Sequence, residues 1–352
     1  MSKHDITQLR LTSQLLSSHT LTTCLDVVTW MGAMQAQDYA GSMWAIGARL
    51  PEGHVDDVAD AFERGQIVRT WPMRGTLHII AATDARWMLT LLTPRVLSAY
   101  GYRMRYHGIT LDVYAKARKL FEKEFQSGGL RTREELYAVL ERGGIATANS
   151  LGLHIIGRLA LEQVICGGPR RGSQPTYAAF DAWIPSAPTK TRDEGLHDIA
   201  IRYLRGHGPA QAQDLSWWAG LSLGDARRAI TMASSELESF THKDRVFYYC
   251  PMPSVGPMPS TLLLPPFDEY VVGYKDRSDC MDLAHAPLVN PGANGMLGAV
   301  VVDHGHLVGT WKKATKKSDK PIIVTPFEQL SSSVERGIPS VVERYQAFMN
   351  HA

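Results

Sequence analysis

The sequence contains no long hydrophobic run and almost no net charge. No segment approaches the roughly 18 consecutive apolar residues that a membrane-spanning helix requires, so we expect no membrane-embedded part. Lys and Arg number 37 against 35 Asp and Glu, which gives a formal net charge of +2. This excess is too small to indicate nucleic-acid binding by itself, so the arrangement of the basic residues matters more than their number.

Cysteine is scarce, and its spacing excludes the usual cysteine-based sites. The four cysteines are Cys24, Cys166, Cys250 and Cys280, and no two are close enough in sequence for a CxxC zinc or redox pair. The residues from Met1 to His4 do not begin a signal peptide. A reducing compartment is the simpler interpretation, so we expect a cytoplasmic protein.

Histidine is not scarce, but its spacing is not that of a metal site. None of the 13 histidines belongs to an HExxH motif. His304 and His306 flank Gly305, which predicts a hairpin turn in preference to a pair of metal ligands. We therefore expect neither a metal nor a cofactor.

The chain does contain a repeated supersecondary pattern. Two or three short helices are followed by a β-hairpin, and this order occurs three times. The predicted hairpin strands are 67–71 with 77–81, 163–166 with 176–180, and 237–241 with 246–250. Helices followed by a hairpin are the outline of a winged helix-turn-helix, so we predict three such modules in tandem at 1–104, 105–190 and 191–254.

The composition changes after a proline-rich linker at 251–259. Short strands are predicted at 262–264, 299–302, 307–310 and 322–325, followed by a helix at 340–349. Residues 255–352 are therefore predicted to form a β-rich, barrel-like domain. The predicted fold class is α+β.

The second repeat gives the clearest local signals. Thr132 and Glu135 have the spacing of a capping box at a helix start. A second helix is predicted at 149–161, with Leu153 on its apolar face. Arg170 and Arg171 fall in the glycine-containing turn 168–172, at the expected tip of the hairpin.

Winged modules suggest DNA as a partner, although they also serve in protein–protein contacts. The local distribution of charge favours DNA. Lys312 and Lys313 begin a lysine-rich run in the C-terminal domain, and a second basic cluster lies within 95–123. Such runs can neutralise phosphates, and they can also be ordinary solvated loops.

Two further segments combine charged and aromatic residues. The hairpin 69–78 carries Arg69, Arg74 and His78 around Trp71. These three polar residues are candidates for lining a DNA-facing cleft, whereas Trp71 is better explained by packing on a neighbouring helix. The segment 267–270 contains paired acids that suit acid–base catalysis, but neighbours on a strand point in opposite directions, which disfavours it.

One tetrapeptide occurs twice. Gln35-Ala36-Gln37-Asp38 returns at 211–214 with the same four letters. Amides at positions i and i+2 do not share a helix face, so they fit better at a bend, where both can point into one cleft. Either copy could be a site, or both could serve only the local turn.

These segments together resemble the winged-helix AlkZ-type DNA glycosylases. The resemblance is carried, in the expected order along almost the whole chain, by the segments 34–37, 69–78, 264–277 and 308–313. It implies three tandem winged helices and a C-terminal β-rich domain in a C shape, with DNA in the concave channel. We expect a monomer.

The resemblance places the family's catalytic Gln-aliphatic-Gln motif on Gln35-Ala36-Gln37. Ala36 is small for the aliphatic position, which is a mild departure. Two glutamines are typical of the crosslink-unhooking branch. The second copy, at 211–214, matches no catalytic position of the family, and we predict that its mutation leaves excision intact.

The implied reaction is hydrolysis of the N-glycosidic bond of an alkylated or crosslinked purine in double-stranded DNA. A glutamine does not take up a proton near neutral pH, but its carbonyl oxygen can hold a water molecule and stabilise positive charge. Asp38 is either the base or, more simply, the cap of the next helix. The competing prediction is a non-enzymatic DNA-binding regulator or lesion binder. Either way, the protein is expected at the nucleoid.

Overall fold

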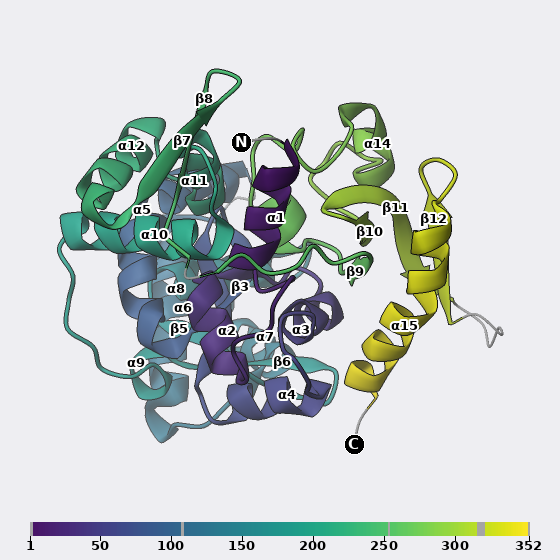
Figure 1. Ribbon diagram of the computed structural model, residues 1–352. Helices are drawn as coiled ribbons and strands as arrows, with labels where there is room; N and C mark the ends of the chain where they lie inside the picture. The colour runs from purple at the N-terminus through teal and green to yellow at the C-terminus, as the bar shows by residue number, and fades with distance from the viewer. Residues whose placement is uncertain (1–2, 107–108, 253, 315–320, 351–352) are drawn as a thin grey trace. The chain divides into compact units, whose positions relative to one another are not determined.

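A computed structural model describes residues 3–106, 109–252, 254–314 and 321–350 (Figure 1). Helices and strands are mixed along the chain, as the predicted α+β class requires. The chain divides into two compact units. The first unit comprises residues 1–58 and 196–352, and the second comprises residues 59–195. The divisions fall inside helix α4 (Val55–Glu63) and helix α10 (Arg192–His207).

The second unit is built from two hairpins and the helices beside them. Its elements are β2 (Ile67–Met73), β3 (Thr76–Ala81), α5 (Ala82–Tyr106), α6 (Leu111–Glu124), β4 (Arg131–Thr132), α7 (Arg133–Arg142), α8 (Leu151–Leu161), β5 (Ile165–Arg171), β6 (Gln174–Ala179) and α9 (Phe180–Trp183). Strands β2 and β3 pair antiparallel, and β4, β6 and β5 form a three-stranded sheet.

The core of this unit confirms two sequence predictions. Trp71 is buried among aromatic and aliphatic side chains that include Tyr100 and Phe121, so it packs inside the unit as expected. The capping box is also present. Thr132 Oγ1 accepts the backbone N–H of Glu135 at 3.2 Å, and Glu135 Oε2 accepts the N–H of Thr132 at 2.6 Å.

The two hairpins of the second unit approach each other through a glycine. Strands β2 and β5 are in contact. A Cβ atom placed on Gly167 would lie 2.2 Å from the carbonyl oxygen of Arg69, which is a backbone atom that cannot rotate away. Only a residue without a side chain therefore fits at this position.

The first unit contains both ends of the described chain. Its elements are α1 (Lys3–Ser13), α2 (Cys24–Met31), β1 (Met34–Gln35), α3 (Tyr39–Gly47), α11 (Ala212–Ala219), α12 (Leu223–Met232), β7 (Glu238–His242), β8 (Arg245–Tyr249), β9 (Leu262–Leu264), α13 (Glu269–Val272), α14 (Ala286–Val289), β10 (Val300–Asp303), β11 (His306–Lys313), β12 (Ile322–Pro326) and α15 (Ser332–Met349), together with most of α10. Strands β7 and β8 form the predicted third hairpin.

The C-terminal strands form one antiparallel sheet in the order β12-β11-β10-β9, with α15 beside it (Figure 1). An aromatic cluster joins this sheet to two helices. Tyr345 of α15 lies 5.2 Å from both Trp44 of α3 and Trp311 of β11, measured between ring centroids. Both indole N–H groups donate to carbonyl oxygens of β9, at 2.7 Å for Trp44 and 2.9 Å for Trp311. The cluster therefore fixes α3 against the sheet.

Several sequence predictions need correction. Leu153 is 39% exposed and lies outside the buried face of α8. Arg170 and Arg171 belong to strand β5, because the strand continues past the predicted turn and reverses only at residues 172–173. Helix α15 begins at Ser332, eight residues before the predicted start at 340, because Ser331 caps it and Pro339 does not interrupt it.

Two long helices were not predicted at all. Helices α5 and α6 occupy a region that the sequence analysis described only by its basic residues. The signal was present in α6, where Tyr114, Ala117 and Phe121 are buried at helical spacing. Helix α5 gives no such signal, because its apolar residues do not gather on one face and Pro94 lies inside it.

No helix among the described residues is long and apolar enough to cross a membrane. All four cysteines lie in the described part of the chain and none forms a disulfide. Cys24, Cys166 and Cys280 are buried, and Cys250 is partly buried.

Candidate active site

The first Gln-Ala-Gln-Asp copy joins β1 to α3 at a bend, as its spacing predicted. Gln35 ends the strand and is 8% exposed, whereas Gln37 and Asp38 lie at the bend and are exposed. Asp38 caps α3, because its Oδ1 accepts the backbone N–H of Gly41 at 2.5 Å. The motif thus combines one buried glutamine, one exposed glutamine and a rigid helix start.

A buried carboxylate holds the backbone of the motif. Glu269, at the start of α13, is 1% exposed, and its Oε1 accepts the N–H of Gln35 at 2.7 Å. Its Oε2 accepts His207 Nε2 and Trp218 Nε1, each at 3.0 Å. Burial of a carboxylate is tolerated here because three donors compensate for the lost hydration.

The neighbouring Asp268 is equally buried but has a different partner. Both of its oxygens accept from Arg49, which lies just after α3, at 2.9 Å, and both side chains are fully buried. Asp268 also caps α13 through the N–H of Tyr270. The sequence analysis treated this segment as a strand, which is wrong. The two acids begin a helical turn, and each one holds part of the scaffold.

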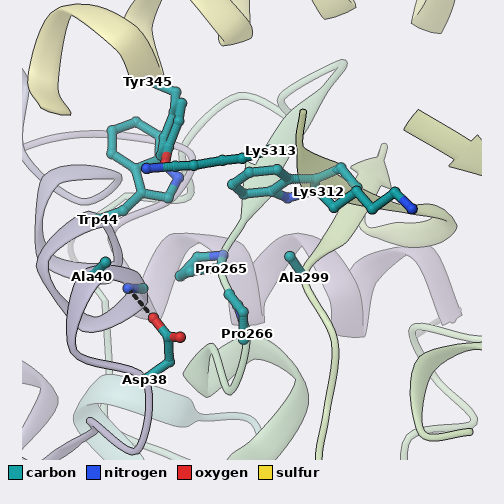
Figure 2. A pocket seen from close by; sticks show the side chains of 11 residues that line it. Asp38, Ala40, Trp44, Pro265, Pro266, Ala299, Lys312, Lys313 and Tyr345 are labelled. Carbon is teal, nitrogen blue, oxygen red and sulfur yellow. Dashed lines mark hydrogen bonds between the residues drawn. The ribbon is translucent and has the colours of Figure 1, made fainter. Parts of the chain in front are cut away.

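A pocket of about 280 Å³ opens next to the motif. Figure 2 shows Asp38 at one side of it, Pro265 and Pro266 along its floor, and Trp44 and Tyr345 at the opposite wall. Its walls are therefore largely apolar and aromatic. A planar or apolar group attached to a substrate suits such a surface better than a highly charged group.

Lys312 and Lys313 also line this pocket. Both side chains are exposed on β11. Lys313 lies over the pocket with its Nζ 5.3 Å from the centre of the Tyr345 ring, and Lys312 points the other way (Figure 2). The structure thus brings two predicted DNA-binding residues to a pocket that begins at Asp38, the residue that follows the glutamine pair.

The second Gln-Ala-Gln-Asp copy has a structural role that the sequence did not reveal. Asp214 is fully buried, and its Oδ2 accepts the N–H of Gln211 at 2.9 Å, which forms the start of α11. Its Oδ1 accepts the N–H of Lys275 at 2.9 Å. Burial raises the pKa of the Asp214 carboxyl above its ordinary value, while the charge of Arg10 opposes that shift.

The polar residues of the β2–β3 hairpin are placed differently from one another. Arg69 is half-buried on β2, and Arg74 is half-buried at the turn. His78 is fully buried. Arg74 Nη2 lies 3.3 Å from His78 Nε2, and His78 Nδ1 lies 2.9 Å from the carbonyl oxygen of Thr76. His78 is thus a buried partner of Arg74 and does not itself reach the surface.

The arginines of the β5–β6 hairpin are exposed and partly tied to their own unit. Arg170 donates to the carbonyl oxygen of Ser173. Arg171 Nη1 lies 3.2 Å from Glu135 Oε1, so it is paired with the capping box of α7. Both hydrogen bonds lie on the surface, where a phosphate can compete for the guanidinium.

A sequence profile described as "DNA glycosylase AlkZ-like" matches residues 28–348, which is most of the chain. The chain belongs to the AlkZ-like DNA glycosylase family. It is therefore a DNA glycosylase, an enzyme that hydrolyses N-glycosidic bonds, with DNA as its substrate. The match begins before the glutamine motif and ends in α15, so it includes the motif, the residues that line the pocket and the hairpin arginines.

Two comparisons with individual proteins agree with this membership. The chain is 24% identical over 340 residues to an "Interstrand DNA cross-link repair glycosylase" of Streptomyces sahachiroi, covering 90% of this chain and 88% of that protein. The solved structure of Streptomyces sahachiroi DNA glycosylase AlkZ has the same fold. Its TM-score is 0.80 at 23% identity, and the match covers 99% of this chain and 96% of that one.

Sequence reasoning missed the residues that support the motif. Glu269 was noticed but was assigned to a strand, and neither His207 nor Trp218 was considered as its partner. The available signal was the polar character of His207 at the end of an apolar helix face that carries Leu196, Ile199 and Tyr203. A buried histidine there requires a partner.

Proposed function

We propose that this AlkZ-like enzyme is a monofunctional DNA glycosylase that removes N-alkylated purines and unhooks interstrand crosslinks. The observation that carries the proposal is the Gln35-Ala36-Gln37 motif, held at a bend with one buried and one exposed glutamine. The relative from Streptomyces sahachiroi, which bears the name of a crosslink repair glycosylase, supports crosslinks as substrates.

The chemistry follows from the nature of the leaving group. An N7- or N3-alkylated purine carries a positive charge, so its glycosidic bond is already weakened. Gln35 and Gln37 then need only to hold the attacking water near C1′ and to stabilise the oxocarbenium-like sugar through their carbonyl oxygens. No group of three or more potential metal ligands occurs among the described residues, and the proposed step uses none.

The basic residues are proposed to contact the DNA backbone. Lys312 and Lys313 flank the pocket beside Asp38, so we assign them to phosphates near the lesion. Four arginines on the two hairpins of the second unit are also assigned to the DNA backbone. They are Arg69 and Arg74 of β2–β3 and Arg170 and Arg171 of β5–β6. His78 is proposed to orient Arg74. Contacts of this kind position a protein on DNA without reading its sequence.

We also propose that residues 1–104, 105–190 and 191–254 act as three winged helix-turn-helix modules and that residues 255–352 form the β-rich domain. The element order supports this assignment. Helices α10, α11 and α12 precede the β7–β8 hairpin, and helices α7 and α8 precede β5–β6. Hairpins of this kind can reach the DNA backbone as wings.

The decisive experiment compares substitutions in the two copies of the motif. Gln35→Ala with Gln37→Ala should abolish release of N7-alkylguanine from duplex DNA and leave the DNA dissociation constant unchanged. The control is Gln213→Ala, which removes the exposed glutamine of the second copy and leaves the Gln211 cap of α11 in place. The control variant should excise at the wild-type rate. Unchanged excision by the first variant would sink the catalytic assignment.

Crosslink unhooking needs its own substrate. The wild-type enzyme should convert DNA carrying a nitrogen-mustard crosslink into separable strands with an abasic site, and the Gln35 and Gln37 double variant should not. Binding to the crosslinked duplex without strand separation by the wild-type enzyme would limit the activity to single adducts.

A further inference from the structure

We propose that Glu269 is a positioning residue for the glycosylase reaction, because it fixes the backbone of Gln35 and thereby the whole glutamine motif. The inference rests on the proposed role of the Gln35 and Gln37 pair. It assigns a function to a buried carboxylate that touches neither DNA nor water in that mechanism.

The first step of the argument concerns the kind of bond. Glu269 Oε1 accepts the backbone N–H of Gln35 at 2.7 Å, with the carboxylate 1% exposed. A bond to a carboxylate is stronger than a bond between neutral groups, and water does not compete for it at a buried site. It also acts on the main chain, so it fixes where the motif begins regardless of which side chain follows.

The second step concerns the other oxygen of the same carboxylate. His207 and Trp218 both donate to Oε2 at 3.0 Å, so the group is held from three sides. His207 is itself fixed by its neighbours. Its ring stacks on Tyr203 with 4.8 Å between centroids and 17° between planes. Rotation of the carboxylate would break all three hydrogen bonds together, so its orientation is fixed.

The third step concerns the short helix that carries Glu269. The start of α13 is held through the fully buried pair of Asp268 with Arg49. The end of α13 is held by Tyr203 Oη, which donates to the carbonyl oxygen of Gly273 at 3.0 Å. A helix of four residues has little stability of its own, so these bonds set the position of Glu269.

The fourth step links the two sequence copies. Helix α11 begins in the second copy, and it supplies Trp218 to Glu269. Asp214 of the same copy accepts the backbone N–H of Lys275, just beyond α13. The first copy and the second copy therefore contact the same segment, 268–276. The second copy supports the site that the first copy forms.

The functional consequence is geometric. A glutamine that positions water cannot compensate for a displaced backbone, because its amide neither takes up nor releases a proton. A mutation far from the reacting atoms can reduce a rate by about 100-fold if it displaces a catalytic group by about 1 Å. Loss of the bond from Glu269 to Gln35 should therefore lower the rate of the chemical step and leave DNA binding intact.

Glu269→Gln tests this proposal with the least change in shape. The substituted amide cannot accept from all three donors, because one of its two polar atoms is itself a donor. We expect the single-turnover excision rate of N7-alkylguanine to fall by about 10- to 100-fold, with the DNA dissociation constant within about twofold of wild type. Trp218→Phe removes one donor and keeps a buried ring, so it should show a smaller fall of the same kind.

The matched control is Asp279→Asn. Asp279 is also buried, and its bonds go to Arg10 and Arg245 instead of the motif. All variants are assayed well below their own melting temperatures. The excision rate of Asp279→Asn should stay within about twofold of wild type. This should hold even if its melting temperature falls by as much as that of Glu269→Gln.

The outcomes separate this inference from the proposed function. Wild-type excision by folded Glu269→Gln, or equal losses for Glu269→Gln and Asp279→Asn, would overturn the positioning role. Continued excision by the Gln35 and Gln37 double variant would instead overturn the catalytic assignment. Both proposals are supported if Glu269→Gln excises slowly, Asp279→Asn excises at close to the wild-type rate and the Gln35 and Gln37 double variant does not excise.

Discussion

The two glutamines of the motif illustrate how much surroundings matter for a single residue type. Gln35 is buried at the end of a strand, and Gln37 is exposed at the following bend. The same letters at 211–214 start a helix, with Asp214 buried and Gln213 exposed. Each copy thus has one buried and one exposed glutamine, and the copies differ in their aspartate, because Asp38 is exposed and Asp214 is fully buried.

Asp38 provides the sharpest test at this scale. Its cap on α3 predicts that Asp38→Ala lowers the free energy of unfolding by about 1 kcal/mol, whereas Asp38→Asn keeps the cap and the stability. If the cap is the only role of Asp38, Asp38→Asn should also excise N7-alkylguanine at close to the wild-type rate. Chemical denaturation and single-turnover kinetics measure the two effects. A stable but inactive Asp38→Asn would make Asp38 the base.

At the scale of elements, the sequence predicted hairpins and helix starts better than it predicted tertiary partners. The capping box at Thr132 and the three hairpins were identified because their signals are local. Helix α13 was mistaken for a strand because four residues carry no measurable periodicity. Its helical turn depends on Asp268 meeting Arg49, which lies 219 positions earlier in the chain.

The candidate site shows the same division. The glutamine motif was found from the sequence through its resemblance to a family. Its support was not found, because Gln35 and Glu269 lie 234 positions apart and only the fold brings them together. His78 was expected to face DNA on the basis of its residue type, and the fold buries it beneath Arg74.

Gly167 tests the contact between the β2 and β5 strands. Gly167→Ala would place a methyl group against the carbonyl oxygen of Arg69, so the hairpins must separate. We expect a loss of unfolding free energy of about 3 kcal/mol, at the upper end of overpacking effects. Gly224→Ala is the control, because nothing lies within 3.4 Å of its Cβ and alanine favours the α12 helix. Urea denaturation should show a lower free energy of unfolding than wild type for Gly167→Ala and a higher one for Gly224→Ala.

At the scale of the whole molecule, the net charge of +2 makes DNA affinity depend on a few local contacts. The four-stranded sheet places Lys312 and Lys313 on one strand beside the pocket. The winged modules and the C shape implied by the resemblance stay predictions. The salt dependence of binding does not require them and can be measured directly.

Lys312→Ala and Lys313→Ala should each weaken DNA binding about equally for all sequences. Each should also reduce the slope of log K against log salt by about 1, because one fewer counterion is released. The control is Arg64→Ala, since Arg64 is exposed and already paired with Asp60 at 3.1 Å. Titrations at several salt concentrations give the slopes. If both lysine variants keep the wild-type salt slope, the contacts to the DNA backbone lie elsewhere.

The burial of the thiols has a chemical consequence under the proposed function, in which the enzyme acts on alkylated DNA. Burial raises the pKa of Cys24 and of Cys166 to about 12, and that of Cys250 to about 11. Only the thiolate form is strongly nucleophilic, so the raised pKa values lower the reactivity of these three thiols near neutral pH. Electrophiles that attack guanine N7 therefore find almost no competing soft nucleophile at these cysteines. These three cysteines are therefore poor targets for the agents that would create the proposed substrate.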